Sequence, residues 1–282
     1  MQAMSVLPLL SEFPQCFRPA RKALCFSVGR ERGAQGMRSM PEGGYMKNVL
    51  FGLTVESSNQ AILDMVFNKA HEARYFSLST LPAEGSLPGS RFLDFMRCAD
   101  DGLLYFGVGT GKPCNEDIEA HPVVTLNGSF VGDDTGESEH RQLISFRITG
   151  RVRRCDNPEA EREYWERNPG SRKMWEKSMD SFVIYCLWQG EGELYQVYKN
   201  DRIYRLRFGF GGVAPRPFHY RVNEARCVGC GACVEACTAG IMTLENGKAH
   251  IPFQHCYECG VCRKACPQGA IEKSPRSDLQ GE

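Results

Sequence analysis

Eight of the fourteen cysteines in this chain fall in two short runs near its C-terminal end. The first run is Cys227, Cys230, Cys233 and Cys237, and the second is Cys256, Cys259, Cys262 and Cys266. Both runs read C-x2-C-x2-C-x3-C, and the second lies 29 residues after the first (256 against 227). Such short spacings let three sulfurs of one tight loop face a single metal centre. The segment therefore predicts two metal centres, one for each run.

The spacing, with Pro267 directly after the last cysteine, resembles the signature of bacterial two-cluster ferredoxins. In that signature the fourth cysteine of each run ligates the other cluster. The resemblance implies one [4Fe–4S] cluster, called cluster I, on Cys227, Cys230, Cys233 and Cys266. It implies a second, cluster II, on Cys256, Cys259, Cys262 and Cys237. Thr238 stands where Pro267 stands in the second run, which is expected to change rigidity near Cys237 without removing a ligand.

Two other uses of cysteine fit this pattern less well. Structural zinc takes four ligands from paired C-x2-C knuckles and does not need a third cysteine at the same pitch in each run. A disulfide framework is typical of small secreted domains, whereas this chain has 282 residues. His250 and His255 lie beside the runs. With eight thiolates available, these histidines are expected to shield a cluster or hydrogen-bond to it rather than to ligate it.

Length and composition restrict the class of protein. The length suits about two domains, and equal numbers of basic and acidic residues, 34 each, give no basic field for nucleic acid. No apolar run is long enough to span a membrane, and the N-terminal residues do not resemble a signal peptide. The many cysteines favour a reducing, cytoplasmic location. The six outside the two runs are expected to be small buried apolar residues: Cys16, Cys25, Cys98, Cys114, Cys155 and Cys186.

The sequence pattern divides the chain into five parts. Residues 1–45 show no steady period and are predicted to be a loose extension, with Met46 as an alternative start of translation. Residues 46–208 form the larger folded domain, followed by a Gly- and Pro-rich linker at 209–218. Residues 219–275 form the ferredoxin-type domain, with a tail at 276–282. Within that domain Asn246-Gly247 predicts a tight hairpin between the two cysteine runs.

Strand patterns dominate the larger domain. Strands are predicted at 74–81, 89–98, 102–108, 123–131, 142–154, 182–188 and 193–208, the last being a hairpin that turns at Asn200-Asp201. Helices are predicted at 57–73, 113–120, 158–167 and 172–179, the last two parted by Asn168-Pro169-Gly170. About six barrel strands with short helices predict an α+β fold built on an antiparallel barrel or sandwich. No strand is followed by the glycine spacing of a Rossmann or P-loop site.

The order of motifs in this domain resembles the flavin-binding split barrel of the pyridoxamine 5′-phosphate oxidase-like superfamily. The motifs are the stretch around Arg91-Phe92, the aromatic strand and Gly-rich turn of residues 104–112, and the strand that opens at His121-Pro122. The sequence departs from the superfamily pattern in two places. No proline separates Arg91 from Phe92, and His121 replaces an asparagine. The resemblance implies a six-stranded antiparallel split barrel that binds FMN and forms a homodimer, with FMN at the subunit interface.

An FMN phosphate requires cations and N–H donors that converge from different strands. Arg91 and Lys112 are the candidate cations. The turn directly before Lys112 offers hydrogen-bond donors from Thr110 and from the backbone of Gly109–Gly111. The predicted FMN-binding residues are Arg91, Phe92, Gly109, Thr110, Gly111 and Lys112. The alternative for Arg91 and Lys112 is a pair of solvated surface charges. No side chain stands out as a catalytic acid or base, so any chemistry would belong to the cofactors.

Three functions are compatible with these modules. The first is a flavin and iron–sulfur oxidoreductase that passes single electrons between two [4Fe–4S] clusters and FMN, which exchanges electrons with a small substrate or carrier. The second is an electron carrier whose barrel serves dimerisation or docking and binds no flavin. The third is a barrel that binds another large cofactor, such as a deazaflavin or haem. In each case a redox partner protein or a small-molecule substrate is expected, and pyridoxamine phosphate oxidation is disfavoured because dioxygen damages such clusters.

Overall fold

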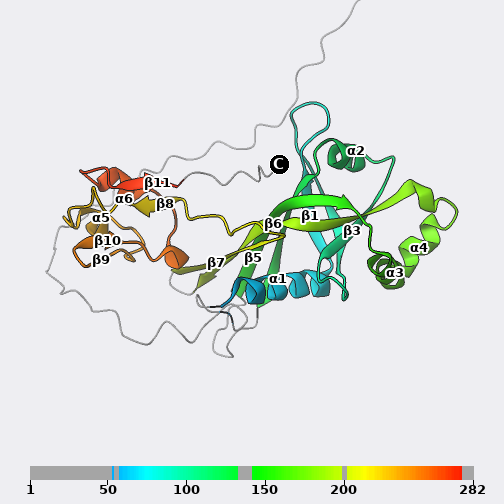
Figure 1. The fold of residues 1–282 in the computed structure, drawn as a ribbon, viewed down its shortest axis with the longest axis horizontal. Helices are drawn as coiled ribbons and strands as arrows, with labels where there is room; N and C mark the ends of the chain where they lie inside the picture. Colours follow the sequence, from blue (N-terminus) through cyan, green and yellow to red (C-terminus); the bar gives the residue numbers. More distant parts are fainter. Residues whose placement is uncertain (1–52, 54–56, 133–141, 199–201, 275–282) are drawn as a thin grey trace, which may run out of the picture. The chain divides into compact units, whose positions relative to one another are not determined.

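The computed structural model describes residue 53 and residues 57–132, 142–198 and 202–274 (Figure 1). Residues 1–45, Met46, the Asn200-Asp201 turn and the 276–282 tail, on which the sequence also makes predictions, lie outside the described residues. No helix in the described part of the chain combines the length and apolar character that a membrane crossing requires.

Helix α1 (Asn59–Ala73) confirms the first predicted helix. The hydroxyl of Ser58 caps its first turn by accepting a hydrogen bond from the Ala61 N–H at 3.1 Å. The helix buries an apolar stripe at helical spacing and packs on β2 and β7. Its first residue, Asn59, is tied to β7 by two hydrogen bonds between its side-chain amide and the backbone of Gly209, at 2.7 and 2.8 Å.

Six strands close into an antiparallel barrel. They are β1 (Tyr75–Thr80), β2 (Gly89–Arg97), β3 (Leu104–Gly109), β4 (Val123–Gly132), β5 (Gln142–Arg154) and β6 (Phe182–Tyr198). Their order around the barrel is β3-β2-β1-β4-β5-β6. The first and last strands of that order then pair with each other, from Leu104↔Leu187 to Gly109↔Phe182, which closes the barrel. The structure thus confirms the predicted α+β fold with a six-stranded antiparallel split barrel.

Strand β6 is longer than predicted. The sequence suggests a break between 188 and 193, whereas the strand continues through it and pairs with β5 along its length. Trp188 is the extra residue of a bulge, because Arg151 faces Gln189 and the next residue of β5 faces Leu187. Gly190 does not end the strand but faces Gly150 across it, where a Cβ would lie 2.7 Å from the Gly150 Cα. Beyond the closed barrel, β7 (Arg202–Phe210) pairs with the far half of β6.

The barrel interior is filled by aromatic and branched side chains. Phe76 lies at its centre, with its ring 4.8 Å from that of Phe146 and 6.2 Å from that of Phe95. Phe106 continues this stack toward Tyr185. A second apolar cluster lies between the barrel wall and the helices that follow β5, and includes Tyr105, Tyr164, Trp165 and Cys186.

Three helices lie in the connections. Helix α2 (Pro113–Ala120) confirms its prediction, and α3 (Pro158–Arg167) begins at the side-chain cap of Asn157. The helix predicted at 172–179 is wrong in its position. The sequence suggests that Pro169 separates two helices, but Pro169 instead opens α4 (Pro169–Trp175). A proline lacks only a backbone donor that the first helical turn leaves unpaired in any case.

The C-terminal segment is small and built around the cysteines. Strand β8 (Tyr220–Val222) pairs with β11 (Ile271–Lys273), and β9 (Thr243–Glu245) pairs with β10 (Lys248–His250). The predicted hairpin turn between β9 and β10 is confirmed, with Asn246 and Gly247 both at positive φ, 51° and 73°. Short helices α5 (Ala232–Glu235) and α6 (Val261–Ala265) and the 3-10 turn η3 (Phe253–His255) complete it.

Candidate functional site

The eight predicted cluster ligands lie around two separate hollows. The first hollow is lined by Cys227, Cys230, Cys233 and Cys266. The second is lined by Cys237, Cys256, Cys259 and Cys262. Each set takes three cysteines from one run and the fourth from the other. This is the same partition that the sequence predicts for clusters I and II.

Within the described residues, no three His, Cys, Asp or Glu side chains converge on a single-ion site. The four thiols of each set instead stand around a hollow. Both loops are shaped by left-handed glycines at equivalent places, Gly231 before α5 and Gly260 before α6. Two thiols of different runs, Cys230 and Cys259, are exposed, while Cys227, Cys233 and Cys262 are buried.

Backbone N–H groups point at several of these sulfurs. The Ala249 N–H lies 3.4 Å from Cys227 Sγ, and the Ala270 N–H lies 3.3 Å from Cys266 Sγ. In the second set, the Glu258 N–H lies 3.3 Å from Cys256 Sγ. Such donors stabilise thiolates and tune the potential of the cluster that the thiolates hold. Four thiols with N–H donors around each hollow therefore fit a [4Fe–4S] cluster.

The protonation of the thiols differs with their surroundings. Hydrogen bonds from the N–H groups of Ala249 and Gly229 lower the pKa of Cys227. The Val261 N–H, and then the Thr238 hydroxyl at 3.6 Å, lower the pKa of Cys259. Burial among the other cysteines raises the pKa of Cys262 to about 11. The Cys262 thiol therefore holds its proton more firmly than a free cysteine, whereas Cys227 and Cys259 are closer to the thiolate form that binds metals.

Four of the six residues predicted to bind FMN line one pocket on the barrel. Arg91, Phe92, Gly109 and Lys112 surround a cavity of about 580 Å³. Small-molecule sites usually measure roughly 300–1,000 Å³. Thr110 and Gly111 do not line this pocket. The N–H and hydroxyl of Thr110 both point to the Ser181 carbonyl oxygen, at 2.9 and 3.3 Å, and are not directed at a ligand.

The basic end of the pocket is formed by Arg91 and Lys112. Nη2 of Arg91 lies 3.9 Å from a carboxylate oxygen of Asp117, while its Nη1 is buried without a hydrogen-bond partner. Asp117 is itself held by the Thr80 hydroxyl at 2.6 Å and the Ala83 N–H at 2.9 Å, and these contacts lower its pKa. Lys112 is exposed at the start of α2. The Cys114 thiol, which also lines the pocket, lies beside the guanidinium. Two cations in the lining of one pocket fit an anionic ligand group.

The other wall of the pocket is aromatic and comes from α3, α4 and the start of β6. The ring of Phe182 lies 5.2 Å from that of Trp175 and 6.2 Å from that of Tyr164. These rings lie against two glycines of β3. A Cβ at Gly107 would stand 2.2 Å from Phe182, and one at Gly109 would stand 2.8 Å from Trp175. Sequence analysis missed this wall, although two glycines inside a strand are a signal of close approach by another group.

Apolar side chains at the rim of the pocket are exposed. Phe92 is 75% exposed, Met174 76% and Tyr75 61%, and all three line the pocket. Single exposed apolar residues are common, but several around one pocket mark a surface that binds something.

Comparison with known proteins identifies the C-terminal segment. Residues 226–271 match the family described as the 4Fe-4S dicluster domain, so this part of the chain is an iron–sulfur, ferredoxin-type domain, as predicted. This match covers less than half of the chain. No curated protein matches the sequence.

Several solved structures are similar to the barrel. A NimC/NimA family protein of Clostridium acetobutylicum is 22% identical over 54% of this chain and 97% of its own (TM-score 0.40). A protein from the same organism related to general stress protein 26, of the pyridoxinephosphate oxidase family, is 15% identical over 54% and 96% (TM-score 0.37). A pyridoxamine 5′-phosphate oxidase-related, FMN-binding protein of Nostoc punctiforme is 15% identical over 56% and 99% (TM-score 0.30). These likenesses are too low to transfer a ligand or an activity, and the fold follows from the strand pairing of this chain.

Proposed function

We propose that this chain is an oxidoreductase in which electrons pass one at a time between two [4Fe–4S] clusters and an FMN held in the barrel pocket. FMN would supply the exchange of electrons with a small substrate or carrier. The iron–sulfur domain makes electron transfer the general role of the chain. The observation that carries the proposal for the barrel is the pocket itself, which is lined by both basic and aromatic side chains.

The lining of the pocket matches the two parts of FMN. Arg91 and Lys112 would bind the phosphate. Phe92 and the wall of Trp175 and Phe182 would contact the flat ring system. None of these side chains is proposed as an acid or base, because their role is to bind the cofactor and to exclude water.

The exposed rim supports a homodimer. Phe92 and Met174 would be covered by a second copy of the chain, which would also cover the mouth of the pocket. Burial of such side chains contributes about 1.5–3 kcal/mol each. Analytical ultracentrifugation of the flavin-loaded protein tests this point, since Met174→Glu should shift the dimer to monomer.

A second function is favoured by one observation. Both donors of Thr110 are directed at Ser181 and not into the pocket, so the turn that follows β3 offers less to a phosphate than the sequence suggests. The second proposal is therefore an electron carrier that transfers electrons through its clusters and binds no flavin.

Anaerobic purification separates the two proposals. The oxidoreductase should contain about eight iron atoms and one FMN per chain, measured by iron assay and by flavin release on denaturation. Iron at that level without flavin, after incubation with excess FMN, would leave only the electron carrier. A haem or deazaflavin spectrum in place of FMN would contradict both proposals for the barrel.

A further inference from the structure

Glu258 occupies an unusual position between two ligands of cluster II. It follows Cys256 by two residues and directly precedes Cys259. Its backbone is left-handed, with φ of 54°, which among the described non-glycine residues occurs elsewhere only at Arg74 and Asn246. Glutamate adopts this conformation at an energetic cost, because its Cβ crowds the backbone. Contacts elsewhere must therefore hold Glu258 in place.

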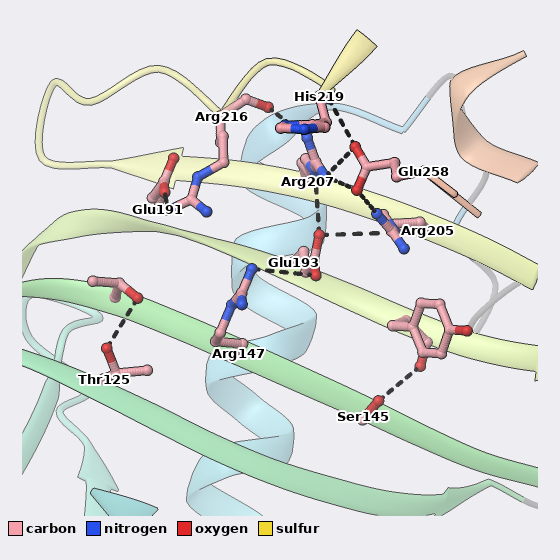
Figure 2. Close-up of polar contacts among 12 residues, drawn as sticks. Thr125, Ser145, Arg147, Glu191, Glu193, Arg205, Arg207, Arg216, His219 and Glu258 are labelled. Atoms are coloured by element: carbon pink, nitrogen blue, oxygen red, sulfur yellow. Dashed lines mark hydrogen bonds and ion pairs between the residues drawn. The ribbon is translucent and has the colours of Figure 1, made fainter. Parts of the chain in front are cut away.

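Those contacts come largely from β7, as Figure 2 shows. The carboxylate of Glu258 accepts a hydrogen bond from Arg205 Nη1 at 2.5 Å and another from Arg207 Nη2 at 3.1 Å. It also accepts one from the His219 N–H at 2.8 Å. Glu193 of β6 lies on the other side of the two arginines, 3.2 Å from Arg207 Nε. The side chains of Arg205 and Arg207 are only 10% and 8% exposed.

Arg147 of β5, which is half-exposed, also pairs with Glu193 at 3.5 Å, and the burial of Arg205 and Arg207 makes the members of this network interdependent. Arg205 and Arg207 alternate along β7 and so lie on one face, between Glu193 and Glu258. Removing one member of a buried ion-pair network leaves an uncompensated charge. A second contact reinforces the first: the His255 ring Nδ1 lies 2.8 Å from the Ile203 carbonyl oxygen. Residues on both sides of Cys256 thus contact β7.

Among the described residues, no hydrogen bond or ion pair joins the cluster I loop to β7 in this way. The internal repeat of 29 residues places Gly229 where Glu258 stands in the second run, and Gly229 has the same left-handed backbone, with φ of 70°. Glycine adopts that conformation without strain. Apolar exposure does not distinguish the two runs, since Val228 and its counterpart Tyr257 are both exposed, 64% and 37%. One run therefore uses the unstrained residue, and the other keeps a strained glutamate that contacts β7.

We propose that Glu258 is a positioning residue that fixes the cluster II loop on β7, through Arg205 and Arg207, and so makes cluster II the one that exchanges electrons with the barrel. Cluster I is then the cluster that meets an external one-electron donor or acceptor. The electron transfer from cluster II to the barrel rests on the proposed FMN, whereas the contact between Glu258 and β7 does not depend on it.

The electron balance of the route is simple. A low-potential one-electron donor would reduce cluster I from the 2+ to the 1+ state, and the electron would pass to cluster II. Its transfer to the barrel cofactor would return cluster II to the 2+ state and reduce the cofactor by one electron. The reverse flow obeys the same order.

The internal repeat supplies the test variant. Glu258→Gly places in the second run the residue that the first run already has, so it relieves backbone strain while removing the contact to β7. The matched control is Arg221→Gln, which removes an exposed partner of Glu272 on the β8–β11 pair. Both variants are made in the full chain, purified anaerobically, and assayed for iron and flavin.

Three measurements follow. In stopped-flow experiments in which oxidised protein is mixed with a one-electron donor, reduced methyl viologen, Glu258→Gly should slow flavin reduction by about tenfold or more, while Arg221→Gln leaves it unchanged. In a redox titration followed by electron paramagnetic resonance, Glu258→Gly should raise the potential of one cluster only, because it removes a negative charge beside cluster II and exposes it. Hydrogen–deuterium exchange should increase at residues 203–207 and 255–259.

Unchanged transfer, potentials and exchange in a Glu258→Gly protein that retains its iron would overturn the proposal. Equal shifts of both cluster potentials would do the same, since the effect would not be local to cluster II. Absence of flavin from the wild-type protein would instead defeat the proposed oxidoreductase. In that event the potentials and the exchange rates still decide whether Glu258 fixes cluster II on β7.

Discussion

The indole of Trp175 lies on the backbone of Gly109, so close that a Cβ on this glycine would stand 2.8 Å from the ring. Gly109 is the last residue of β3, and Trp175 is the last residue of α4. Their contact sets the width of the pocket between the barrel strand and the aromatic wall. The residue at position 109 thereby controls how closely α4 approaches β3.

A first prediction concerns this contact. Gly109→Ala should destabilise the protein by about 1–3 kcal/mol, because the added methyl group must displace the indole or the strand. Urea unfolding followed by tryptophan fluorescence measures the change. In a Trp175→Ala background the same substitution should cost much less, and this coupling energy isolates the steric contact. Gly111→Ala is the matched control, since a Cβ there meets nothing within 4 Å. Equal losses of stability from Gly109→Ala and Gly111→Ala would show that the contact with Trp175 is not what makes alanine costly at position 109.

A second prediction tests the basic end of the pocket. Arg91→Ala and Lys112→Ala should each weaken FMN binding by about 1.5–3 kcal/mol, or about 10- to 150-fold, through loss of a charge-assisted contact to the phosphate. Fluorescence titration of the apoprotein with FMN measures the affinity. Arg172→Ala, on the exposed surface of α4 and away from the pocket lining, is the control. Full FMN retention by both pocket variants would show that the phosphate does not bind there.

The order of the elements could be predicted from the sequence because the signals are local. Ser58 caps α1, and Asn246-Gly247 forms the predicted turn of a hairpin. The cysteine spacing is equally local, since three sulfurs of one loop face one hollow. Such features depend on residues a few positions apart, so a single sequence carries them.

Features that join distant parts of the chain could not be predicted in this way. Gly190 resembles a strand break until Gly150 is known to face it across the sheet. The aromatic wall of the pocket depends on how α4 returns to β3, which no periodicity specifies. The contact of Glu258 with Arg205 depends likewise on where the cysteine loop meets β7. Alternation along β7 indicates only that its arginines share a face.

A third prediction follows from the depressed pKa of Asp117. Hydrogen bonds from Thr80 and Ala83 hold this pKa below its ordinary value of 3.8. The ionised carboxylate therefore contributes stability that is fully present above about pH 4 and is lost as the pH falls through the pKa of the folded state. Asp117→Asn should lower the free energy of unfolding at pH 7 by about 1 kcal/mol, and the difference from wild type should narrow below pH 3.8.

Tryptophan fluorescence suits this measurement, because the three tryptophans of the chain, Trp165, Trp175 and Trp188, all belong to the barrel domain. Cluster loss in acid then leaves the probe in place. Glu116→Gln, an exposed carboxylate on the same helix, controls for the general loss of a negative charge. If wild type and Asp117→Asn differ in free energy of unfolding by the same amount from pH 7 to pH 3, ionisation of Asp117 does not stabilise the fold.

A fourth prediction concerns the cysteines outside the two runs. Cys98, Cys114 and Cys186 are buried, as expected for small apolar residues, and Cys155 is half-buried. Burial raises the pKa of Cys186 to about 11. At pH 8 only about one such thiol in a thousand is ionised, against about one in four for a free cysteine, and the thiolate is the reactive form. Iodoacetamide should therefore leave the three buried thiols unmodified in the native protein, as measured by peptide mass spectrometry. The same thiols should react fully in guanidinium chloride, and rapid native labelling of Cys186 would show that the wall between β3 and β6 opens to solvent.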